Sequence, residues 1–573
     1  MRKTLLLFIT LLSGFAALSA QTVYVDGETA IVDSKSGVRY AAVRAGEDDA
    51  QLSVSLTFGE ERYTRFVLDG VAYTPGDVAT VRANMPQHEL VLESGEGRDT
   101  LALALTTLPI VTLERSAPNP FSLYYSVPVR FRLIDPYART EGRRVFESAA
   151  NVELRGSSAS RMDKKSYSVD LVEDGAADDA SEEEERDANL LGMRETDSWI
   201  LDGAAIDYSR MRNRVCFDLW NEMSTLRDGD MQRNGTRGSF CEVFVDGEYN
   251  GLYCLSDKVN RSLLGLKKTK LEESGGEVKG LLYKCKGADT PGHFLQLSEG
   301  QTLPPDSTEV YYDWYMKYPK ENYTAECWEP LYDLMCRTDG IVLTEESVQD
   351  ALSCFYEDNL VEYAVFAMSV SLLDNFMHNT YLSVKNKTKS SKCWITPWDM
   401  DGSLGRDGAS SQLDIVADSR HVFQSAHPFR PWYDNWVQPF WDKYVALWDK
   451  LHQGSLSSAH VSEVVDCYTR QIEQSGTWKR ERERWDGINN FWLDKPICLA
   501  ESLSVEAEYI KGWYARNEVA QNALLESIGS VSASAPSESS ADIYRIDGTK
   551  VRESDFGSLP HGVYIVRGRK VVK

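Results

Sequence analysis

The arrangement of apolar residues along the chain constrains the fold more than any other feature. In residues 21–110 apolar and polar residues alternate with period two, as in Leu52-Ser53-Val54-Ser55-Leu56. Turn dipeptides such as Asp26-Gly27 and Asp69-Gly70 separate these runs. Alternation indicates half-buried strands, and short strands with frequent turns are typical of a sandwich of two sheets. We therefore expect a small, immunoglobulin-like β-sandwich at residues 21–110.

Residues 111–520 carry a mixed pattern, with strands in the first half and helices in the second. The first half contains Val129–Leu133 and a hairpin at Cys241–Tyr253, whose central Asp246-Gly247 suits a tight turn. The second half has helical periodicity, at Ser347–Asp358, Leu360–Leu373, Asp442–Leu451 and Ser462–Ser475. Strands followed by helices predict an α+β domain with two lobes, and ligands commonly bind in the cleft of such a fold.

The N-terminal end of the chain carries a pattern of export. Residues 1–20 combine Arg2-Lys3, an apolar run and small residues up to Ala20, which is typical of a secretory signal peptide. No later segment approaches the ~18 uninterrupted apolar residues of a membrane-spanning helix. A Ser-rich linker at 521–541 precedes a tail at 542–573 that contains short strand patterns. We expect an exported, soluble protein without a transmembrane segment.

The charge balance limits the partners. The chain has 87 acidic and 62 basic side chains other than histidine, a net charge of −25. This excess of negative charge argues against nucleic acid and anionic membranes as partners. A site for a nucleotide would therefore need cationic groups of its own.

The ten cysteines all lie between Cys216 and Cys498, so they belong to the central unit. No two of them have the C-x2-C spacing, which argues against a zinc site. An even number of cysteines in an exported protein permits disulfides. A large core also accommodates buried thiols, and both interpretations stay open.

A loop of small residues precedes one of the predicted strands. Arg155-Gly156-Ser157-Ser158-Ala159-Ser160 leads to Lys164-Lys165 and a strand at Ser166–Leu171. Small residues let backbone N–H groups approach phosphate oxygens, and a neighbouring lysine supplies positive charge. Lys165 stands at the entry to the strand, where a phosphate-binding lysine could sit. The alternative is an ordinary turn in solvent.

A helix is predicted to start at Asp207, whose side chain is suited to capping its N-terminus. Val215, Leu219 and Met223 would form its apolar stripe. The simplest interpretation is a core helix with Arg212 and Arg214 in solvent. In the alternative, one of the two arginines faces a phosphate.

Carboxylate and amide side chains gather in two nearby stretches. Asp374 and Asn379 are five residues apart, and Asp399 and Asp401 follow in the sequence Pro-Trp-Asp-Met-Asp-Gly. In protein kinases, residues in this order orient the attacking hydroxyl and hold magnesium on ATP. Oxygen ligands at this density suit magnesium. The chain lacks the HRD, DFG and GxGxxG motifs of ordinary kinases, and the alternative is a set of turn or capping aspartates.

Aromatic residues are concentrated between Phe429 and Trp448. Phe440, Trp441, Tyr444 and Trp448 have helical spacing, which favours core packing. Stacking of this stretch on a sugar is the alternative, and it would make Trp432 and Trp436 part of a glycan-binding module.

Taken in order, several of these segments resemble the CotH kinase family of spore-coat proteins. The resemblance covers roughly residues 120–520 and rests on five segments: Arg155–Tyr167, Trp199–Arg214, Val243–Asp257, Asp374–Asn379 and Pro397–Gly402. The family is an atypical, secreted, protein-kinase-like group that uses ATP and a divalent metal to phosphorylate serines of surface proteins. The resemblance therefore implies an atypical two-lobed kinase-like domain at residues 111–520, with ATP and Mg²⁺ or Mn²⁺ as cofactors.

The same resemblance assigns roles to individual residues. Asp374 would be the catalytic residue, and Lys165 would contact the phosphates together with its loop. The further cofactor-binding residues of that loop would be Arg155, Ser157 and Ser158. The metal ligands would be Asn379, Asp399 and Asp401. In this loop Met162-Asp163 precedes the lysines, where family members more often have an aromatic residue and a proline.

The C-terminal tail resembles the sorting signal of the type IX secretion system of Bacteroidetes. The matching segments are Ile543–Val551, Leu559–Val566 and Lys570–Lys573. The resemblance implies type IX secretion machinery as a partner and a secreted or cell-surface location. We expect a secreted atypical kinase that acts on serines of surface or secreted proteins. The alternatives are a non-catalytic surface or adhesion protein on the same fold and a glycan-binding module.

Overall fold

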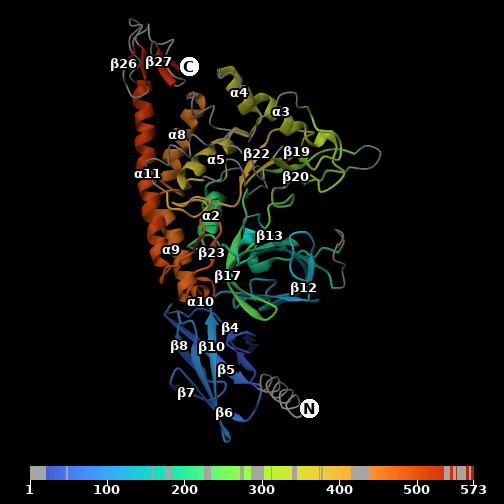
Figure 1. Cartoon of the computed structure of the whole chain (residues 1–573), viewed down its shortest axis with the longest axis vertical. Helices are drawn as coiled ribbons and strands as arrows, with labels where there is room; N and C mark the ends of the chain where they lie inside the picture. The colour runs from blue at the N-terminus through green and yellow to red at the C-terminus, as the bar shows by residue number, and fades with distance from the viewer. Residues whose placement is uncertain are drawn as a thin grey trace. The chain divides into compact units, whose positions relative to one another are not determined.

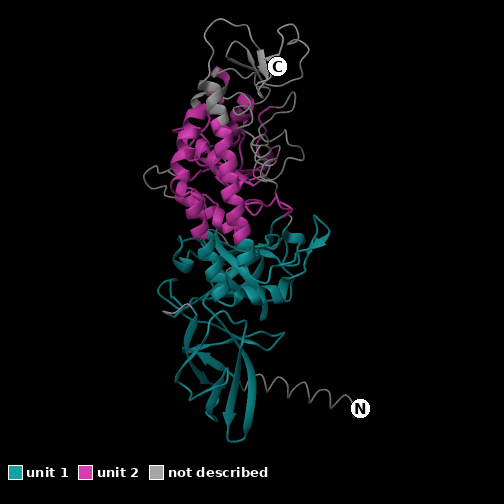
Figure 2. Ribbon diagram, turned by 90° about the vertical axis from the view of Figure 1, so that its left-hand side faces the viewer, with its two compact units in different colours: residues 1–211, 237–258, 465–507 teal, residues 212–236, 259–464, 508–573 magenta. Residues whose placement is uncertain are grey.

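The structure is a computed structural model of the chain. It describes residues 21–46, 50–157, 159–174, 184–224, 234–271, 276–285, 302–311, 313–338, 345–372, 375, 379–413 and 438–533, and the tail strands named below. The chain divides into two compact units (Figure 2). Unit 1 contains residues 1–211, 237–258 and 465–507, and unit 2 contains residues 212–236, 259–464 and 508–573.

The first part of unit 1 is a sandwich of two β-sheets (Figure 1). The four-stranded sheet has the order β2-β1-β5-β8, with bounds Glu28–Thr29, Val23–Val25, Gln51–Phe58 and Val78–Arg82. The six-stranded sheet has the order β3-β4-β10-β9-β6-β7, with bounds Ile31–Val32, Arg39–Ala42, Gly97–Thr106, His88–Ser94, Tyr63–Leu68 and Val71–Tyr73. Leu52, Val54 and Leu56 alternate inward along β5 and pack against residues of the other sheet. The period-two pattern therefore produces the predicted sandwich.

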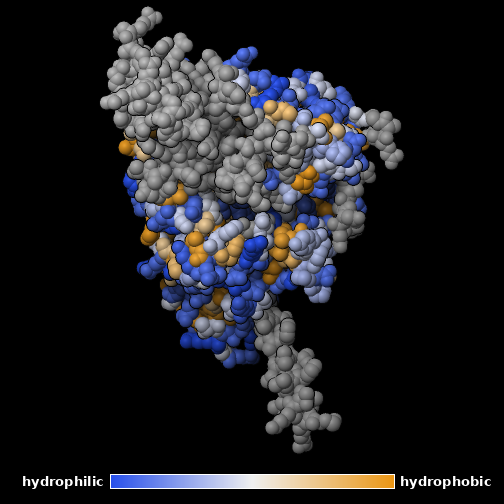
Figure 3. Space-filling model, turned by 45° about the horizontal axis from the view of Figure 1, so that its top comes forward, coloured by the Kyte–Doolittle hydropathy of each residue, from blue (hydrophilic) through white to orange (hydrophobic). Residues whose placement is uncertain are grey.

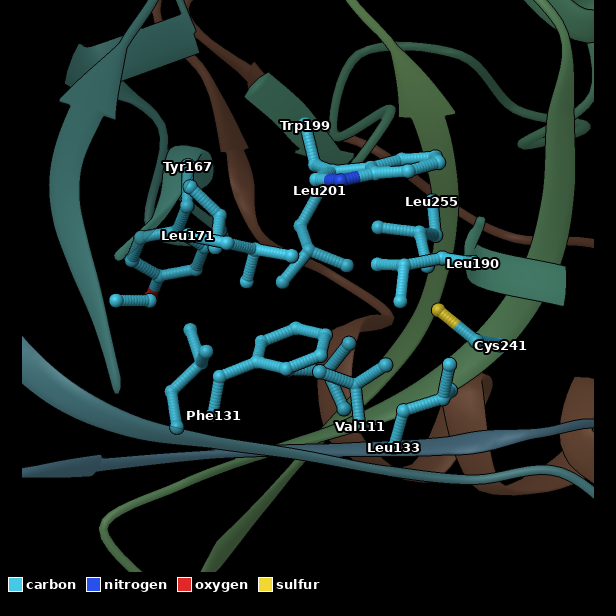
Figure 4. Packing of buried hydrophobic residues seen from close by; sticks show 14 of the residues in the cluster. Val111, Phe131, Leu133, Tyr167, Leu171, Leu190, Trp199, Leu201, Cys241 and Leu255 are labelled. Carbon is cyan, nitrogen blue, oxygen red and sulfur yellow. The ribbon is translucent and has the colours of Figure 1, made fainter. Parts of the chain in front are cut away.

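The second part of unit 1 is a closed barrel of seven strands in the order β11-β12-β13-β14-β15-β17-β16. Their bounds are Ile110–Arg115, Val127–Ile134, Val145–Arg155, Ser166–Val172, Ser198–Asp202, Glu248–Asp257 and Gly238–Val245. A parallel pairing of β11 with β16 closes the barrel. Side chains from different strands fill its interior, and Figure 4 shows Phe131, Tyr167, Trp199 and Leu255 pointing toward one another.

The hairpin predicted at Cys241–Tyr253 is confirmed as β16 and β17. Asp246 and Gly247 form its turn, and both have positive φ angles, 50° and 77°. Such a turn matches the right-handed twist of the two strands, and Asp-Gly is a preferred dipeptide for it.

Three further elements of unit 1 come from late in the sequence. Helix α10 (Thr477–Trp485) packs against β17, and the short strands β23 (Asn489–Asn490) and β24 (Lys495–Pro496) follow it. Arg480 of α10 forms an ion pair with Glu242 of β16 and donates hydrogen bonds to the carbonyl oxygens of Met85 and Pro86. One helix therefore contacts both the barrel and the connection between strands β8 and β9 of the sandwich.

Unit 2 is built around a five-stranded antiparallel sheet in the order β19-β20-β18-β21-β22. The bounds are Val310–Tyr311, Trp314–Tyr318, Leu281–Cys285, Thr380–Val384 and Trp394–Pro397. All residues of β21 and β22 are buried. Burial of every residue in both strands shows that the two strands are covered on both faces.

The helices of unit 2 are α2 (Arg212–Met223), α3 (Glu329–Thr338), α4 (Glu345–Ser353), α5 (Glu357–Val370) and α8 (Gln438–His452). Helix α5 is buried from Asn359 to Val370, because it packs against α8 and β22. Helices α9 (Ser458–Gln474) and α11 (Ser504–Ala533) each contribute residues to both units.

The tail forms a four-stranded sheet in the order β26-β25-β27-β28, with bounds Lys550–Val551, Ile543–Arg545, Val563–Val566 and Arg569–Val572. The sequence predicts short strands here, and the observed sheet agrees with that pattern. The linker predicted at residues 521–541 differs, since α11 continues to Ala533. The helix formers Ala520–Ser527 extend α11 into the Ser-rich segment, and residues 534–540 lie outside the described ranges.

Helix α2 corrects the prediction for residues 207–223. It begins at Arg212 and not at Asp207, because the Asp207 carboxylate accepts hydrogen bonds from the backbone N–H and hydroxyl of Ser209. The prediction that Arg212 and Arg214 lie in solvent is wrong. Both are buried, and their guanidinium groups donate to the backbone carbonyls of Ser403 and Thr236.

The described surface is mostly hydrophilic on the face drawn in Figure 3, where hydrophobic residues occur in scattered spots. This is the surface expected from a net charge of −25. Among the helices of the described ranges, none combines the length and the apolar character that a membrane crossing requires.

Candidate active site

Two of the predicted metal ligands lie at one end of the β21–β22 hairpin in unit 2. Thr380, the first residue of β21, pairs with Pro397, the last residue of β22. Asn379 directly precedes Thr380, and Asp399 follows Pro397 by two residues. The antiparallel register therefore brings Asn379 and Asp399 to the same end of the sheet, although twenty residues separate them in sequence.

Asn379 and Asp399 share an unusual backbone conformation. Their φ angles are 55° and 57°, in the left-handed region. This region costs free energy for most side chains, and Asn and Asp tolerate it better than others. Both residues are half-buried, as is Asp401. Side chains that could bind an ion thus project from two sharp bends at adjacent strand ends.

A buried asparagine connects these two bends. The Nδ2 atom of Asn375 lies 3.0 Å from the carbonyl oxygen of Asn379 and 2.5 Å from the carbonyl oxygen of Trp398. The backbone carbonyl of Asn375 itself accepts hydrogen bonds from the hydroxyls of Thr380, at 2.6 Å, and Tyr363, at 3.3 Å. Because Tyr363 belongs to α5, the bends are anchored to a buried helix.

The first turn of α2 holds the segment that follows Asp399. Oδ1 of Asn213 accepts a hydrogen bond from the backbone N–H of Met400, at 3.1 Å. Nε of the buried Arg212 donates to the carbonyl oxygen of Ser403, at 3.2 Å. Gly402 allows a close approach of two chain segments, because a Cβ atom there would lie 2.9 Å from the backbone nitrogen of Gly408.

Aromatic rings and one lysine line the sheet beside this hairpin end. The ring of Trp398 packs edge-on against Phe217 of α2 and Tyr381 of β21. Nζ of Lys284, on the neighbouring strand β18, lies 5.4 Å from the ring centre of Tyr381 and 5.6 Å from that of Trp398. A cation is attracted to the faces of such rings, so the positive charge of Lys284 lies beside Tyr381 and Trp398.

Lys165 and its loop belong to unit 1. Nζ of Lys165 donates to the carbonyl oxygens of Ser160, at 2.9 Å, and Met162, at 2.6 Å. Gly156 has a φ of 86°, and a Cβ atom there would lie 2.8 Å from Cβ of Ala159. The loop is therefore tightly turned, and two of the three hydrogens on Nζ are used inside it.

The adjacent Lys164 has a different environment, which sequence reasoning missed. Its Nζ lies 2.6 Å from Oε1 of Glu481 on α10 and 2.6 Å from the carbonyl oxygen of Leu252. Arg210 also pairs with Glu481, at 2.8 Å, and all three charged side chains are buried. Burial lowers the pKa of the Lys164 ammonium group to about 8, and the Glu481 carboxylate opposes this shift.

The structure thus brings together some of the predicted site residues. Asn379, Asp399 and Asp401 lie on one loop region of unit 2, while Arg155, Ser157 and Lys165 lie in unit 1. Asp374 and Ser158 are outside the described residues. Within the described ranges, no three His, Cys, Asp or Glu side chains form a metal-binding group.

The structure also tests the predictions for the cysteines and for part of the aromatic stretch. The ten cysteines all lie in the described ranges and none forms a disulfide. Phe440, Trp441, Tyr444 and Trp448 are buried on α8, which confirms core packing for these residues. Trp432 and Trp436 lie outside the described residues.

Comparison with known families gives one result. No curated protein matches the chain at a significant level. The family model described as CotH kinase protein matches residues 152–520, a span that begins in β13, includes the β21–β22 hairpin and ends within α11. This match covers more than half of the chain. The protein is therefore kinase-like and belongs to the CotH kinase protein family.

Proposed function

We propose that the protein is a metal-dependent kinase that transfers the γ-phosphoryl group of ATP to serine hydroxyls of surface or secreted proteins. The observation that carries the proposal is the register of β21 and β22, which places Asn379 and Asp399 at one strand end. Family membership supplies the reaction class. In kinases an Asn and a later Asp hold the magnesium ions that bridge ATP phosphates.

The donor chemistry at the hairpin end fits a divalent cation. Asn379 offers an amide oxygen, and Asp399 and Asp401 offer carboxylates, which are the hard oxygen ligands of Mg²⁺ and Mn²⁺. Asn379 and Asp399 are the residues that would hold the ion, with Asp401 as a further ligand. When bound, the ion would neutralise negative charge on the phosphate oxygens.

The protein's own residues would orient the reactants. By analogy with the family, Asp374 accepts the proton of the attacking serine hydroxyl and aligns it with the γ-phosphorus. Lys284 beside Trp398 supplies positive charge within unit 2. By the same analogy, Arg155, Ser157, Ser158 and Lys165 are proposed as the residues that contact the phosphates. Most of the rate gain in such a reaction comes from positioning and electrostatics.

Phosphate transfer to a serine peptide tests this proposal. Asp374→Ala and Asp399→Ala are each expected to lower the metal-dependent rate by about 10²–10³-fold, because each removes a group that acts on the transition state. Asp449→Ala, which removes an exposed carboxylate of α8 in the same unit, serves as the matched control. Undiminished transfer by Asp399→Ala with an intact circular dichroism spectrum would refute the assignment.

The location forms part of the proposal. The signal-like residues 1–20 and the tail sheet β25–β28 support export and recognition by type IX secretion machinery. Terminal sequencing of the protein recovered outside the cell checks both ends. A chain that retains residue 1 and stays inside the cell would contradict this location.

A further inference from the structure

Asp399 is held by two asparagines from different segments of unit 2, the buried Asn375 and the half-buried Asn213. The peptide group before Asp399 contains the carbonyl of Trp398, which accepts a hydrogen bond from Nδ2 of Asn375. The peptide group after Asp399 contains the N–H of Met400, which donates to Oδ1 of Asn213. The orientations of these two peptide groups define the φ and ψ angles of the residue between them. Together the two side chains fix the backbone of Asp399.

The conformation that they fix is one that Asp399 would otherwise avoid. Its φ of 57° is unfavourable for a residue with a Cβ atom, and such conformations persist only where the surroundings enforce them. Asn375 also donates to the carbonyl oxygen of Asn379, whose φ is 55°. The same amide group therefore restrains both proposed metal ligands at once.

Asn375 is not arranged for maximal stability. Its side chain is 1% exposed, yet its Oδ1 has no hydrogen-bond partner among the residues that the structure describes. A buried acceptor without a partner is unfavourable for folding. The opposite orientation of the amide would place Oδ1 against two carbonyl oxygens. Unfavourable features such as this unpaired buried acceptor are expected at functional sites.

We propose that Asn375 and Asn213 are positioning residues, which set the left-handed conformation of Asp399 and thereby the geometry of the metal site. The inference rests on the proposed function for its consequence, because the ion would bind to Asn379 and Asp399. Residues that orient metal ligands through hydrogen bonds, without binding the metal themselves, commonly affect metal affinity by about 10–100-fold. Asn375 acts through its donor hydrogens, whereas Asn213 acts through its acceptor oxygen.

This difference between donor and acceptor makes the inference testable with Mn²⁺, whose binding to the full chain is followed by electron paramagnetic resonance. Asn375→Leu and Asn213→Leu should each weaken Mn²⁺ binding by about 10–100-fold. Asn213→Asp keeps an acceptor for the Met400 N–H and should restore near-normal affinity. Asn375→Asp loses both donors and should bind as weakly as Asn375→Leu.

Asn359 of α5 provides a matched control, because its side chain bonds to the backbone of β22, the strand that leads to Asp399. It is buried, and its side chain accepts from the N–H of Ile395 and donates to the carbonyl of Ile395, four residues before Asp399. Asn359→Leu should lower thermal stability and leave Mn²⁺ affinity unchanged in the folded protein. If it weakened binding as much as Asn375→Leu, general loosening of unit 2 would replace positioning as the explanation.

Hydrogen exchange gives a readout that does not depend on the metal. The Met400 amide should exchange faster in Asn213→Leu than in the natural protein and in Asn213→Asp. Unchanged exchange would overturn the positioning role, whatever the metal affinities. If the natural protein itself binds no Mn²⁺, the proposed function fails, while faster exchange in Asn213→Leu would still support control of the Asp399 backbone.

Discussion

In unit 1 buried charges of the barrel and of α10 neutralise one another, whereas in unit 2 asparagine side chains restrain the backbone beside half-buried carboxylates. Glu481 accepts from Lys164 and Arg210, and Glu242 pairs with Arg480 through two hydrogen bonds. In unit 2, by contrast, Asn375 donates to the carbonyl of Asn379 and to that of Trp398, the residue before Asp399. Buried charges that pair with one another make a rigid scaffold, while half-buried carboxylates remain in contact with solvent.

The contrast also explains why charge alone is a poor guide to the site. The buried ion pairs Lys164–Glu481, Arg210–Glu481 and Arg480–Glu242 all lie in unit 1. A buried pair that satisfies itself has no capacity for a ligand. The residues that mark the candidate site are instead an asparagine and an aspartate with left-handed backbones, at adjacent strand ends.

The largest expected effect on the free energy of unfolding comes from disrupting the buried ion pairs of unit 1. Glu481→Leu leaves Lys164 and Arg210 without their shared carboxylate and also removes the acceptor of the Leu252 N–H. Loss of one partner from a buried ion pair costs about 3–5 kcal/mol. Urea unfolding should therefore show a fall of this size in the free energy of unfolding. Glu483→Ala, an exposed residue of the same helix, is the control and should change it by less than about 0.5 kcal/mol. A small effect of Glu481→Leu would mean that the charges are not a scaffold.

A smaller effect on stability is expected in unit 2, where His452 is a buried titratable group. Burial lowers the pKa of His452 to about 4, although its hydrogen bond to the Trp448 carbonyl opposes the shift. In the unfolded chain the imidazole binds a proton below about pH 6.5. Between pH 6.5 and 4 the unfolded state thus binds more protons, and stability falls as the pH falls.

The expected loss across that window is about 3 kcal/mol, since the pKa falls from 6.5 to about 4 and each unit corresponds to about 1.4 kcal/mol. His452→Gln lacks the titration and should lose less stability over the same range. The free energy of unfolding measured at several pH values checks this. Equal pH dependence in the two proteins would show that His452 does not titrate as its burial requires.

The sequence predicted the elements of the fold better than their contacts. Alternation in β5 and the Asp246-Gly247 turn are local signals, and both gave the correct structure. The predicted start of α2 was wrong because the Asp207 carboxylate accepts a hydrogen bond from Ser209. An aspartate can form such a local turn as well as it can cap a helix. Arg212 is buried because the carbonyl of Ser403, 191 residues later, accepts its hydrogen bond.

The sequence predicted only those parts of the candidate site that depend on residues close together in the chain. Asp399 and Asn379 stand in recognisable segments, and the hairpin register brings them together. Nothing in the sequence distinguishes Lys164 from Lys165, since the partner that separates them, Glu481, is 317 residues away. Asn375 is likewise inconspicuous, because its role depends on two carbonyl groups whose positions only the fold defines.

The most direct test of the hairpin end as the metal and nucleotide centre is a thermal-shift titration with ATP and Mg²⁺. At ten times its Kd, a ligand that binds only the folded state stabilises it by about 1.4 kcal/mol. The natural protein should show this metal-dependent stabilisation, and Asp399→Asn should lose most of it while Asp449→Ala keeps it. Equal stabilisation of the natural protein and Asp399→Asn, or no stabilisation of the natural protein, would contradict the account.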